Sequence, residues 1–141
     1  MCSTALKSVD RATLPRKSAI LCVDDSQEML LICKTMLEAG DCEVFTAADG
    51  QAGLQALQQH SIDLAVIDDR MPGMRGAELA RAIKRIYKDL PIIMFSGSKV
   101  ASESLESLES VDFFVSKSNG PIALRKVVRS LLERRAAGNY Q

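Results

Sequence analysis

Apolar and polar positions follow two regular patterns along this chain. Four short runs, typical of strands buried on both faces, are almost wholly apolar: residues 19–23, 64–67, 92–95 and 113–115. A shorter strand is predicted over residues 43–46. The segments between strands instead repeat apolar residues at helical spacing, as Ile32, Cys33 and Met36 do. Strands therefore alternate with helices, which predicts an α/β fold.

Five helices are predicted, one after each strand, and the sequence specifies them unequally. Apolar stripes mark helices around residues 29–37, 54–57, 80–87 and 124–131. The fourth helix in chain order, over residues 99–110, is rich in Ser and Glu and places only Ala101, Leu105 and Leu108 at helical spacing. We expect that helix to be weakly specified and mobile. The whole pattern is (βα)5, the doubly wound arrangement in which helices cover both faces of a parallel sheet.

Polar side chains stand where the predicted strands end. In chain order they are Asp24 and Asp25, Asp68, Ser96 and, shortly after the last strand, Lys117. Because the carboxyl ends of parallel strands share one edge of a sheet, we expect these carboxylates, the hydroxyl and the ammonium to converge on one site.

Composition limits the classes of protein to which the chain can belong. Its 141 residues, 47% of them hydrophobic, are enough for one domain with a proper core. Basic and acidic residues balance at 18 each, which argues against direct nucleic-acid binding and favours proteins or small ligands as partners. The cysteines lack CxxC spacing and are expected to be reduced core residues. No apolar stretch suits a membrane span or a secretion signal, so we expect a cytoplasmic protein.

One folded domain is expected, over residues 18–135, between two short extensions. Residues 1–17 mix charged and small residues and are expected to form a flexible N-terminal extension. Residues 136–141 form a C-terminal tail that is too short to fold. Since no output domain follows, the chain either acts through a protein partner or is part of a longer protein.

The residues at the strand ends resemble those of the receiver domains of two-component response regulators. The resemblance runs over residues 18–135 and rests on four motifs in order: Asp24-Asp25, Asp68-Asp-Arg-Met-Pro72, Ser96-Gly97 and Lys117. It implies a flavodoxin-like three-layer sandwich whose five-stranded parallel sheet has the order 2-1-3-4-5. It also implies transfer of a phosphoryl group to Asp68 from the phosphohistidine of a sensor histidine kinase or of a phosphotransfer protein.

The chemistry of phosphoryl transfer accounts for these residue types. A carboxylate attacks phosphorus only if a divalent cation and a fixed ammonium offset the negative charge, which explains the acidic pair and Lys117. We expect Mg²⁺ (or Mn²⁺) to take Asp25 and Asp68 as direct ligands and Asp24 partly through water. The backbone carbonyl of Arg70 would complete the protein ligands, and the site needs no other cofactor.

Ser96 and Phe114 are predicted to form a switch. Ser96 can donate a hydrogen bond to a phosphoryl oxygen, and Gly97 leaves room for that group. Phe114 matches the switch aromatic of the family, although simple core packing explains it equally well. The signal is expected to reach a downstream protein effector through residues 99–110, the strand 113–115 and the last helix. Opposite charges on this face could support a weak homodimer, with Glu103, Glu106 and Glu109 facing Arg125, Lys126 and Arg129.

Other residues near these motifs are expected to have ordinary structural roles. The side chains of Asp69 and Arg70 are expected on the surface of a loop, and His60 is expected to be a surface residue. The basic residues of the last helix are expected to form a solvated face. The chain has one histidine, which argues against Ser-His catalysis and against a zinc site.

Two alternatives to a phosphorylated receiver stay open. We expect a signalling domain, not an enzyme, that catalyses only its own phosphorylation and dephosphorylation. A phosphorylation-independent interaction module with the same fold is the first alternative. A Mg²⁺-dependent aspartyl phosphatase is the second, but such enzymes usually carry an Asp where this chain has Arg70.

The chain departs from the family pattern after Lys117. The family usually has a cis proline after the lysine, but Ser118 stands there in this chain. A trans peptide is expected, because a cis peptide before Ser118 would cost about 3 kcal/mol.

Overall fold

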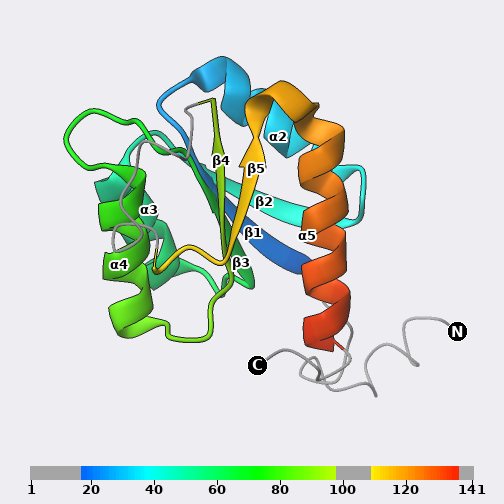
Figure 1. Cartoon of the computed structure of the whole chain (residues 1–141). Coiled ribbons are helices and arrows are strands. Elements are labelled where there is room, and N and C mark those ends of the chain that lie inside the picture. Colours follow the sequence, from blue (N-terminus) through cyan, green and yellow to red (C-terminus); the bar gives the residue numbers. More distant parts are fainter. Residues whose placement is uncertain (1–16, 98–108, 137–141) are drawn as a thin grey trace, which may run out of the picture.

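The computed structural model describes residues 17–97 and 109–136, and Figure 1 shows its elements. Along the chain these are β1 (Ser18–Val23), α2 (Gln27–Glu38), β2 (Cys42–Ala47), α3 (Gly50–Gln59), β3 (Leu64–Ile67), α4 (Gly76–Ile86), β4 (Ile92–Ser96), β5 (Phe113–Ser116), a 3-10 turn η4 (Lys117–Asn119) and α5 (Gly120–Ala136). All five predicted strands are present. The predicted helix over 99–110 lies almost entirely outside the described residues, as do the expected terminal extensions.

All five strands are parallel and form one sheet in the order β2-β1-β3-β4-β5. This confirms the order implied by the sequence resemblance. The register aligns the ends of the two central strands, because Val23 of β1 lies beside Ile67 of β3. Asp24 and Asp68, which follow these residues, therefore leave the sheet side by side.

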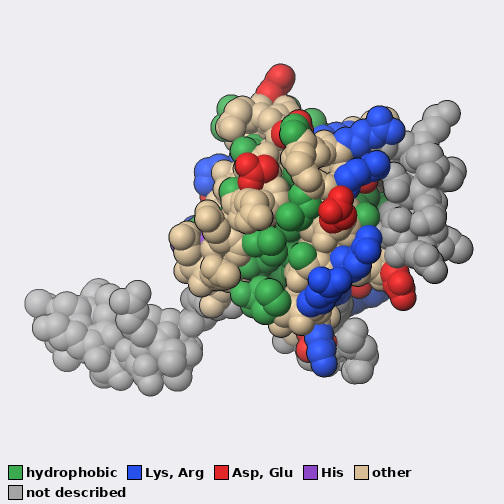
Figure 2. Space-filling view, turned by 90° about the vertical axis from the view of Figure 1, so that its left-hand side faces the viewer, with side chains coloured by type: hydrophobic (Ala, Val, Ile, Leu, Met, Phe, Trp, Pro, Cys, Tyr) green, Lys and Arg blue, Asp and Glu red, His purple; other side chains and the backbone are tan. Residues whose placement is uncertain are grey.

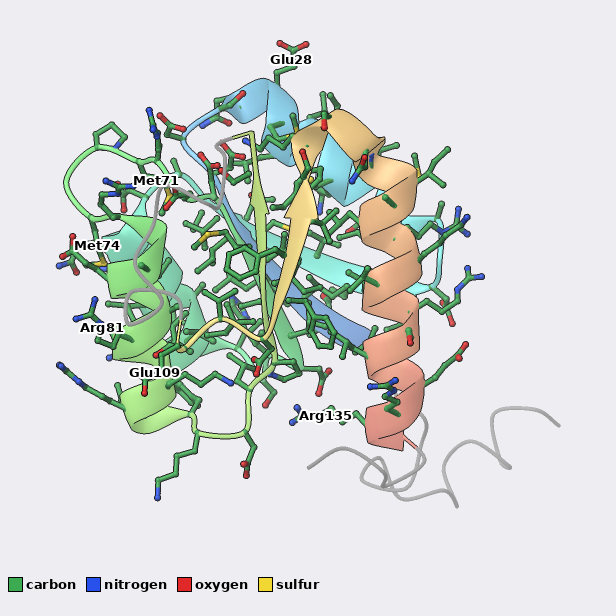
Figure 3. All side chains as sticks on the ribbon, viewed as in Figure 1. Glu28, Met71, Met74, Arg81, Glu109 and Arg135 are labelled. Atoms are coloured by element: carbon green, nitrogen blue, oxygen red, sulfur yellow. The ribbon has the colours of Figure 1, made fainter. Side chains whose placement is uncertain are left out.

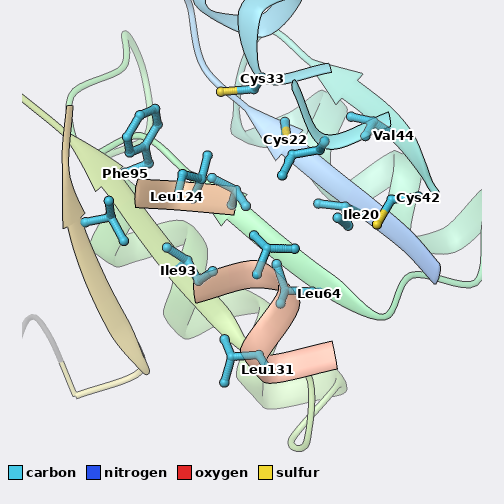
Figure 4. Close-up of a cluster of buried hydrophobic side chains, with 14 of the residues drawn as sticks. Ile20, Cys22, Cys33, Cys42, Val44, Leu64, Ile93, Phe95, Leu124 and Leu131 are labelled. Carbon is cyan, nitrogen blue, oxygen red and sulfur yellow. The ribbon is translucent and has the colours of Figure 1, made fainter. Parts of the chain in front are cut away.

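Helices cover both faces of the sheet and complete three layers (Figure 1). One face carries α2 and α5, and the other carries α3 and α4. Each face of the sheet packs against its helices in a hydrophobic core, and successive strand residues belong to the two cores in turn. In β1, Ile20 and Cys22 pack toward α2 and α5 (Figure 4), whereas Leu21 and Val23 pack toward α3 and α4. Because both faces are covered, β3 and β4 are buried at every residue, which is why their sequences are apolar without alternation.

The edge strand β5 differs from the expectation that it is buried on both faces. Phe113 and Phe114 are 37% and 38% exposed, whereas Val115 is buried. The reason is position, because among the described strands β5 pairs with β4 alone and stands at the end of the sheet. Core packing as the explanation of Phe114 is therefore wrong, and its switch role stays a prediction.

Side-chain caps fix where two helices begin on the site side of the sheet. At α2, Ser26 Oγ accepts a hydrogen bond from the Met29 amide at 3.2 Å. At α3, Asp49 Oδ1 accepts one from the Ala52 amide at 2.8 Å. The first of these caps also anchors the short loop between β1 and α2, which carries the acidic pair.

The cysteines behave as predicted where the structure describes them. Cys22, Cys33 and Cys42 are buried, free thiols. Burial raises the pKa of the Cys33 thiol to about 11, so that thiol stays protonated at neutral pH. On the outside, Lys and Arg side chains gather in a band on the side of the molecule shown in Figure 2. Arg81 and Arg85 of α4 are exposed. Among the described helices, none has both the length and the apolarity to cross a membrane.

Candidate functional site

Two carboxylates follow β1 at the carboxyl edge of the sheet, the upper end in Figure 3, near Glu28. Asp24 is only 5% exposed, whereas Asp25 is open to solvent. The Asp24 amide donates to the carbonyl of Ala47 at 3.1 Å, and Asp24 Oδ1 accepts from the Ser26 amide at 2.9 Å. One carboxylate of the pair is thus fixed and buried, and the other is accessible.

Asp68 follows β3, the strand next to β1. Its amide donates to the carbonyl of Val23 at 2.9 Å, which extends the pairing of the two strands, and the residue is 7% exposed. Burial, and after it the negative charge of Asp24, raises the pKa of Asp68 above its ordinary value. The ionised carboxylate is therefore held in an unfavourable environment, which an added positive charge would relieve.

Lys117 brings an ammonium to both buried carboxylates. Its Nζ lies 2.8 Å from Asp24 Oδ2 and 3.3 Å from Asp68 Oδ1. Partial burial lowers the pKa of Lys117, but the hydrogen bond to Asp24 and the charges of Asp68 and Asp24 outweigh burial, so the pKa is raised. The lysine therefore stays charged at neutral pH.

A tight turn after β5 places that lysine. Lys117 begins the 3-10 turn η4, which Ser116 Oγ caps by accepting a hydrogen bond from the Ser118 amide at 3.2 Å. The peptide between Lys117 and Ser118 is trans, since the described residues contain no cis peptide bond. This confirms the trans peptide expected from the missing proline. Lys117 therefore reaches the carboxylates without a cis peptide bond.

The carboxylates of Asp24, Asp25 and Asp68 fit a divalent cation. One oxygen from each lies within 4.8 Å of the others. Carboxylate oxygens are the ligands that Mg²⁺ prefers, and Mg²⁺ keeps several waters in addition to one or two carboxylates. Three carboxylates face one ammonium, so a cation would also offset the remaining negative charge. The donor set therefore suits the predicted ion; the role of the Arg70 carbonyl stays a prediction.

Ser96 and Gly97 lie at the carboxyl end of β4, the strand next to β3 in the sheet. Ser96 ends β4, is buried, and lies beside Ser116 in the register with β5. A Cβ built on Gly97 would meet no atom within 4 Å in the described part of the chain. This open space is what the expected entry of a phosphoryl group requires.

Asp69 corrects one expectation from the sequence. It is 2% exposed, not a surface loop residue, and its Oδ2 lies 3.4 Å from Arg75 Nη2. The alternation of side chains along a strand predicts that the residue after Asp68 points toward the layer of α3 and α4, but it does not predict that α4 covers that residue. Arg70 is exposed, as expected.

His60 and the basic residues of α5 lie away from the acidic cluster. His60 is exposed at the end of α3, as predicted, and its ring stacks on Phe45 with centroids 3.9 Å apart. Lys126 and Arg129 are exposed on α5, which agrees with a solvated face. None of these residues joins the carboxylates and Lys117.

Comparison with known proteins gives consistent matches over most of the chain. The family model described as "Response regulator receiver domain" matches residues 20–129. The sensor protein GacS of Pseudomonas syringae pv. syringae is 34% identical over 124 residues, which cover 84% of this chain and 13% of GacS. The response regulator GtcR of Aneurinibacillus migulanus is 32% identical over 116 residues, which cover 82% of this chain and 48% of GtcR. The chain thus spans half or less of the length of these relatives.

Solved structures show the same fold. The response regulator TrrA of Thermotoga maritima, in complex with Mg(2+)-BeF, matches with a TM-score of 0.75 and 31% identity, covering 81% of this chain and 98% of TrrA. TrrA in complex with the histidine kinase ThkA matches with a TM-score of 0.74 and 30% identity, covering 82% and 98% of the two chains. With its strand order, its acidic cluster and these matches, the chain belongs to the response regulator receiver domains of two-component systems.

Proposed function

We propose that this receiver domain accepts a phosphoryl group on Asp68, with Mg²⁺ bound, from the phosphohistidine of a histidine kinase or a phosphotransfer protein. The contact of Lys117 Nζ with the buried Asp68 carboxylate, 3.3 Å away, carries the proposal. It places a fixed positive charge where negative charge accumulates when phosphorus approaches a carboxylate.

In the transfer, a carboxylate oxygen of Asp68 forms the new bond to phosphorus while the bond between phosphorus and the donor's imidazole nitrogen breaks. The imidazole takes up a proton as it leaves. Lys117 offsets the charge on the phosphoryl oxygens, and Ser96 donates a hydrogen bond to one of them. Asp24 holds Lys117 in place through its 2.8 Å contact. Burial of Asp68 keeps bulk water away from the product.

The cation would be held by Asp25 and Asp68, by Asp24 partly through water, and by the carbonyl of Arg70. When bound, Mg²⁺ supplies the positive charge that lets a phosphoryl group approach a cluster of carboxylates. The complex of TrrA with Mg(2+)-BeF supports this assignment, because TrrA shares the fold with 31% identity.

The partner and the output complete the proposal. The complex of TrrA with the histidine kinase ThkA supports a histidine kinase as phosphodonor. Ser96 and Phe114 would carry the signal to the face formed by residues 99–110, β5 and α5, where a protein effector or a second copy of the chain binds. Phe114 is already 38% exposed at that face. Most of residues 99–110, with the acidic partners expected for a dimer, lie outside the described residues.

Labelling with a small phosphodonor tests the acceptor. Phosphoramidate with Mg²⁺ should add one phosphoryl group to the wild type, as seen by intact-mass measurement, and none to Asp68→Asn. Asp41→Asn is the matched control, because Asp41 is an exposed carboxylate in the turn before β2 and should label normally. Labelling of Asp68→Asn would move the acceptor elsewhere. A wild type that takes no phosphoryl group from any donor would favour a phosphorylation-independent module.

A further inference from the structure

Asp69, the residue after the proposed acceptor, is buried and incompletely hydrogen-bonded. Its Oδ2 pairs with Arg75 Nη2 at the rather long distance of 3.4 Å. Within the described residues, its Oδ1 is buried without a hydrogen-bond partner. An unpaired buried carboxylate oxygen lowers stability, and Arg75, whose side chain is 49% exposed, offsets little of the cost of burying the charge of Asp69. Stability therefore gives no reason for an aspartate at this position.

The backbone of Asp69 is tied to the same point of α4 as its side chain. The Asp69 carbonyl accepts a hydrogen bond from the Gly76 amide at 2.8 Å, and Gly76 is the first residue of α4. Arg75, which pairs with the side chain, is the residue just before it. These two contacts close the loop over residues 70–74 against the helix. Arg70, whose carbonyl is a predicted metal ligand, is the first residue of that loop.

Asp68 and Asp69 point to opposite sides of the sheet. Asp68 reaches Lys117 on the side of the acidic cluster, whereas Asp69 reaches Arg75 at the start of α4. One peptide unit joins the two residues, so a change in the orientation of Asp69 rotates the peptide that carries Asp68. The buried carboxylate is thus placed to control the acceptor without touching the phosphoryl group.

We propose that Asp69, together with Arg75, is a positioning residue for phosphoryl transfer. Its ion pair fixes the loop over residues 70–74 against α4, and thereby the direction of the Asp68 carboxylate and of the Arg70 carbonyl. Groups that orient metal ligands typically change metal affinity or activity by about 10- to 100-fold when they are removed. The inference rests on the proposed phosphorylation of Asp68.

Three variants separate positioning from simple structural support: Asp69→Ala, Arg75→Ala and the double variant. Each is measured for its labelling rate with phosphoramidate at saturating Mg²⁺, its Mg²⁺ affinity by calorimetry, and its Tm without Mg²⁺. Asp69→Ala should lose about tenfold in labelling rate and in Mg²⁺ affinity while its Tm stays equal or rises. Arg81→Ala, which changes an exposed arginine of the same helix (Figure 3), is the matched control and should match the wild type.

The double variant gives the decisive comparison. Arg75→Ala should lower the Tm, because it leaves the Asp69 carboxylate buried without its ion pair. Adding Asp69→Ala removes that charge, so the Tm should recover while labelling and Mg²⁺ affinity stay low. A structural role alone would restore all three together, and that result would overturn the proposal.

Two further results have clear meanings. Asp69→Ala with the labelling rate and Mg²⁺ affinity of the wild type would also overturn the positioning role. A wild type that binds Mg²⁺ but takes no phosphoryl group would instead remove the proposed function. In that case weaker Mg²⁺ binding by Asp69→Ala would still support its role in orienting the metal ligands.

Discussion

Gly76, the first residue of α4, lies so close to the acceptor strand that a single added methyl group should disturb the site. A Cβ on Gly76 would lie 2.3 Å from the Asp68 carbonyl oxygen and 2.9 Å from the Asp69 Cα. Ordinary contacts between non-bonded heavy atoms lie at about 3.5 Å, so the gap is short by about 1 Å. The neighbours are backbone atoms and cannot rotate away. Gly76→Ala must therefore displace either α4 or the peptide that carries Asp68.

The expected magnitude follows from two opposing effects. Overpacking costs about 1–3 kcal/mol, and a contact with rigid backbone belongs at the upper end of that range. Alanine regains at most about 1 kcal/mol through its better helix propensity. The free energy of unfolding should therefore fall by about 2 kcal/mol. Because a shift of about 1 Å in a reacting group can cost about 100-fold in rate, labelling of Asp68 should slow by about that factor.

Gly50→Ala is the matched control, because Gly50 is likewise the first residue of its helix, α3. Its Cβ would meet Met74 Sδ at 2.7 Å, but that atom is the flexible end of a side chain and can move; the contact with Met74 Cβ, at 3.1 Å, is tight but much longer than the contacts at Gly76. Urea unfolding measures the free energy of unfolding of both variants, provided that the m-value stays the same as in the wild type. Mass spectrometry measures the labelling rates. If Gly76→Ala unfolds and labels like Gly50→Ala, the argument from backbone contact is wrong.

Two further predictions concern the carboxylates. Burial, and after it the charge of Asp24, raises the pKa of Asp68, so its ionisation destabilises the folded state as the pH rises. Without Mg²⁺, Asp68→Asn should therefore have a higher urea midpoint than the wild type at pH 7, and the difference should vanish below about pH 4. A difference that stays constant across this pH range would contradict a raised pKa of Asp68 as its cause. Asp25→Ala should weaken Mg²⁺ affinity, measured by calorimetry, more than Asp24→Ala does, because Asp25 is the proposed direct ligand. Equal losses would argue against that assignment.

Local pattern was enough to predict the strands and the residues at their carboxyl ends. Buried strands need continuous apolar runs, and this requirement holds whatever the neighbours are, so β3 was predicted with its observed bounds of Leu64–Ile67. The meeting of Asp24, Asp68 and Lys117 followed from one further rule, that parallel strands share a carboxyl edge.

The burial of a side chain depends on which strand or helix packs against it, and a sequence read position by position does not contain that information. Phe114 looks like a core residue in its apolar run but lies exposed because β5 is the edge of the sheet. Asp69 looks like a loop residue but is buried, because the first turn of α4 packs against it and brings Arg75 to its carboxylate. The sequence by itself thus determined the fold and the chemical groups of the site. Only the tertiary structure decided which of those groups are buried and what orients them, because burial and ion pairing arise from contacts between segments distant along the chain.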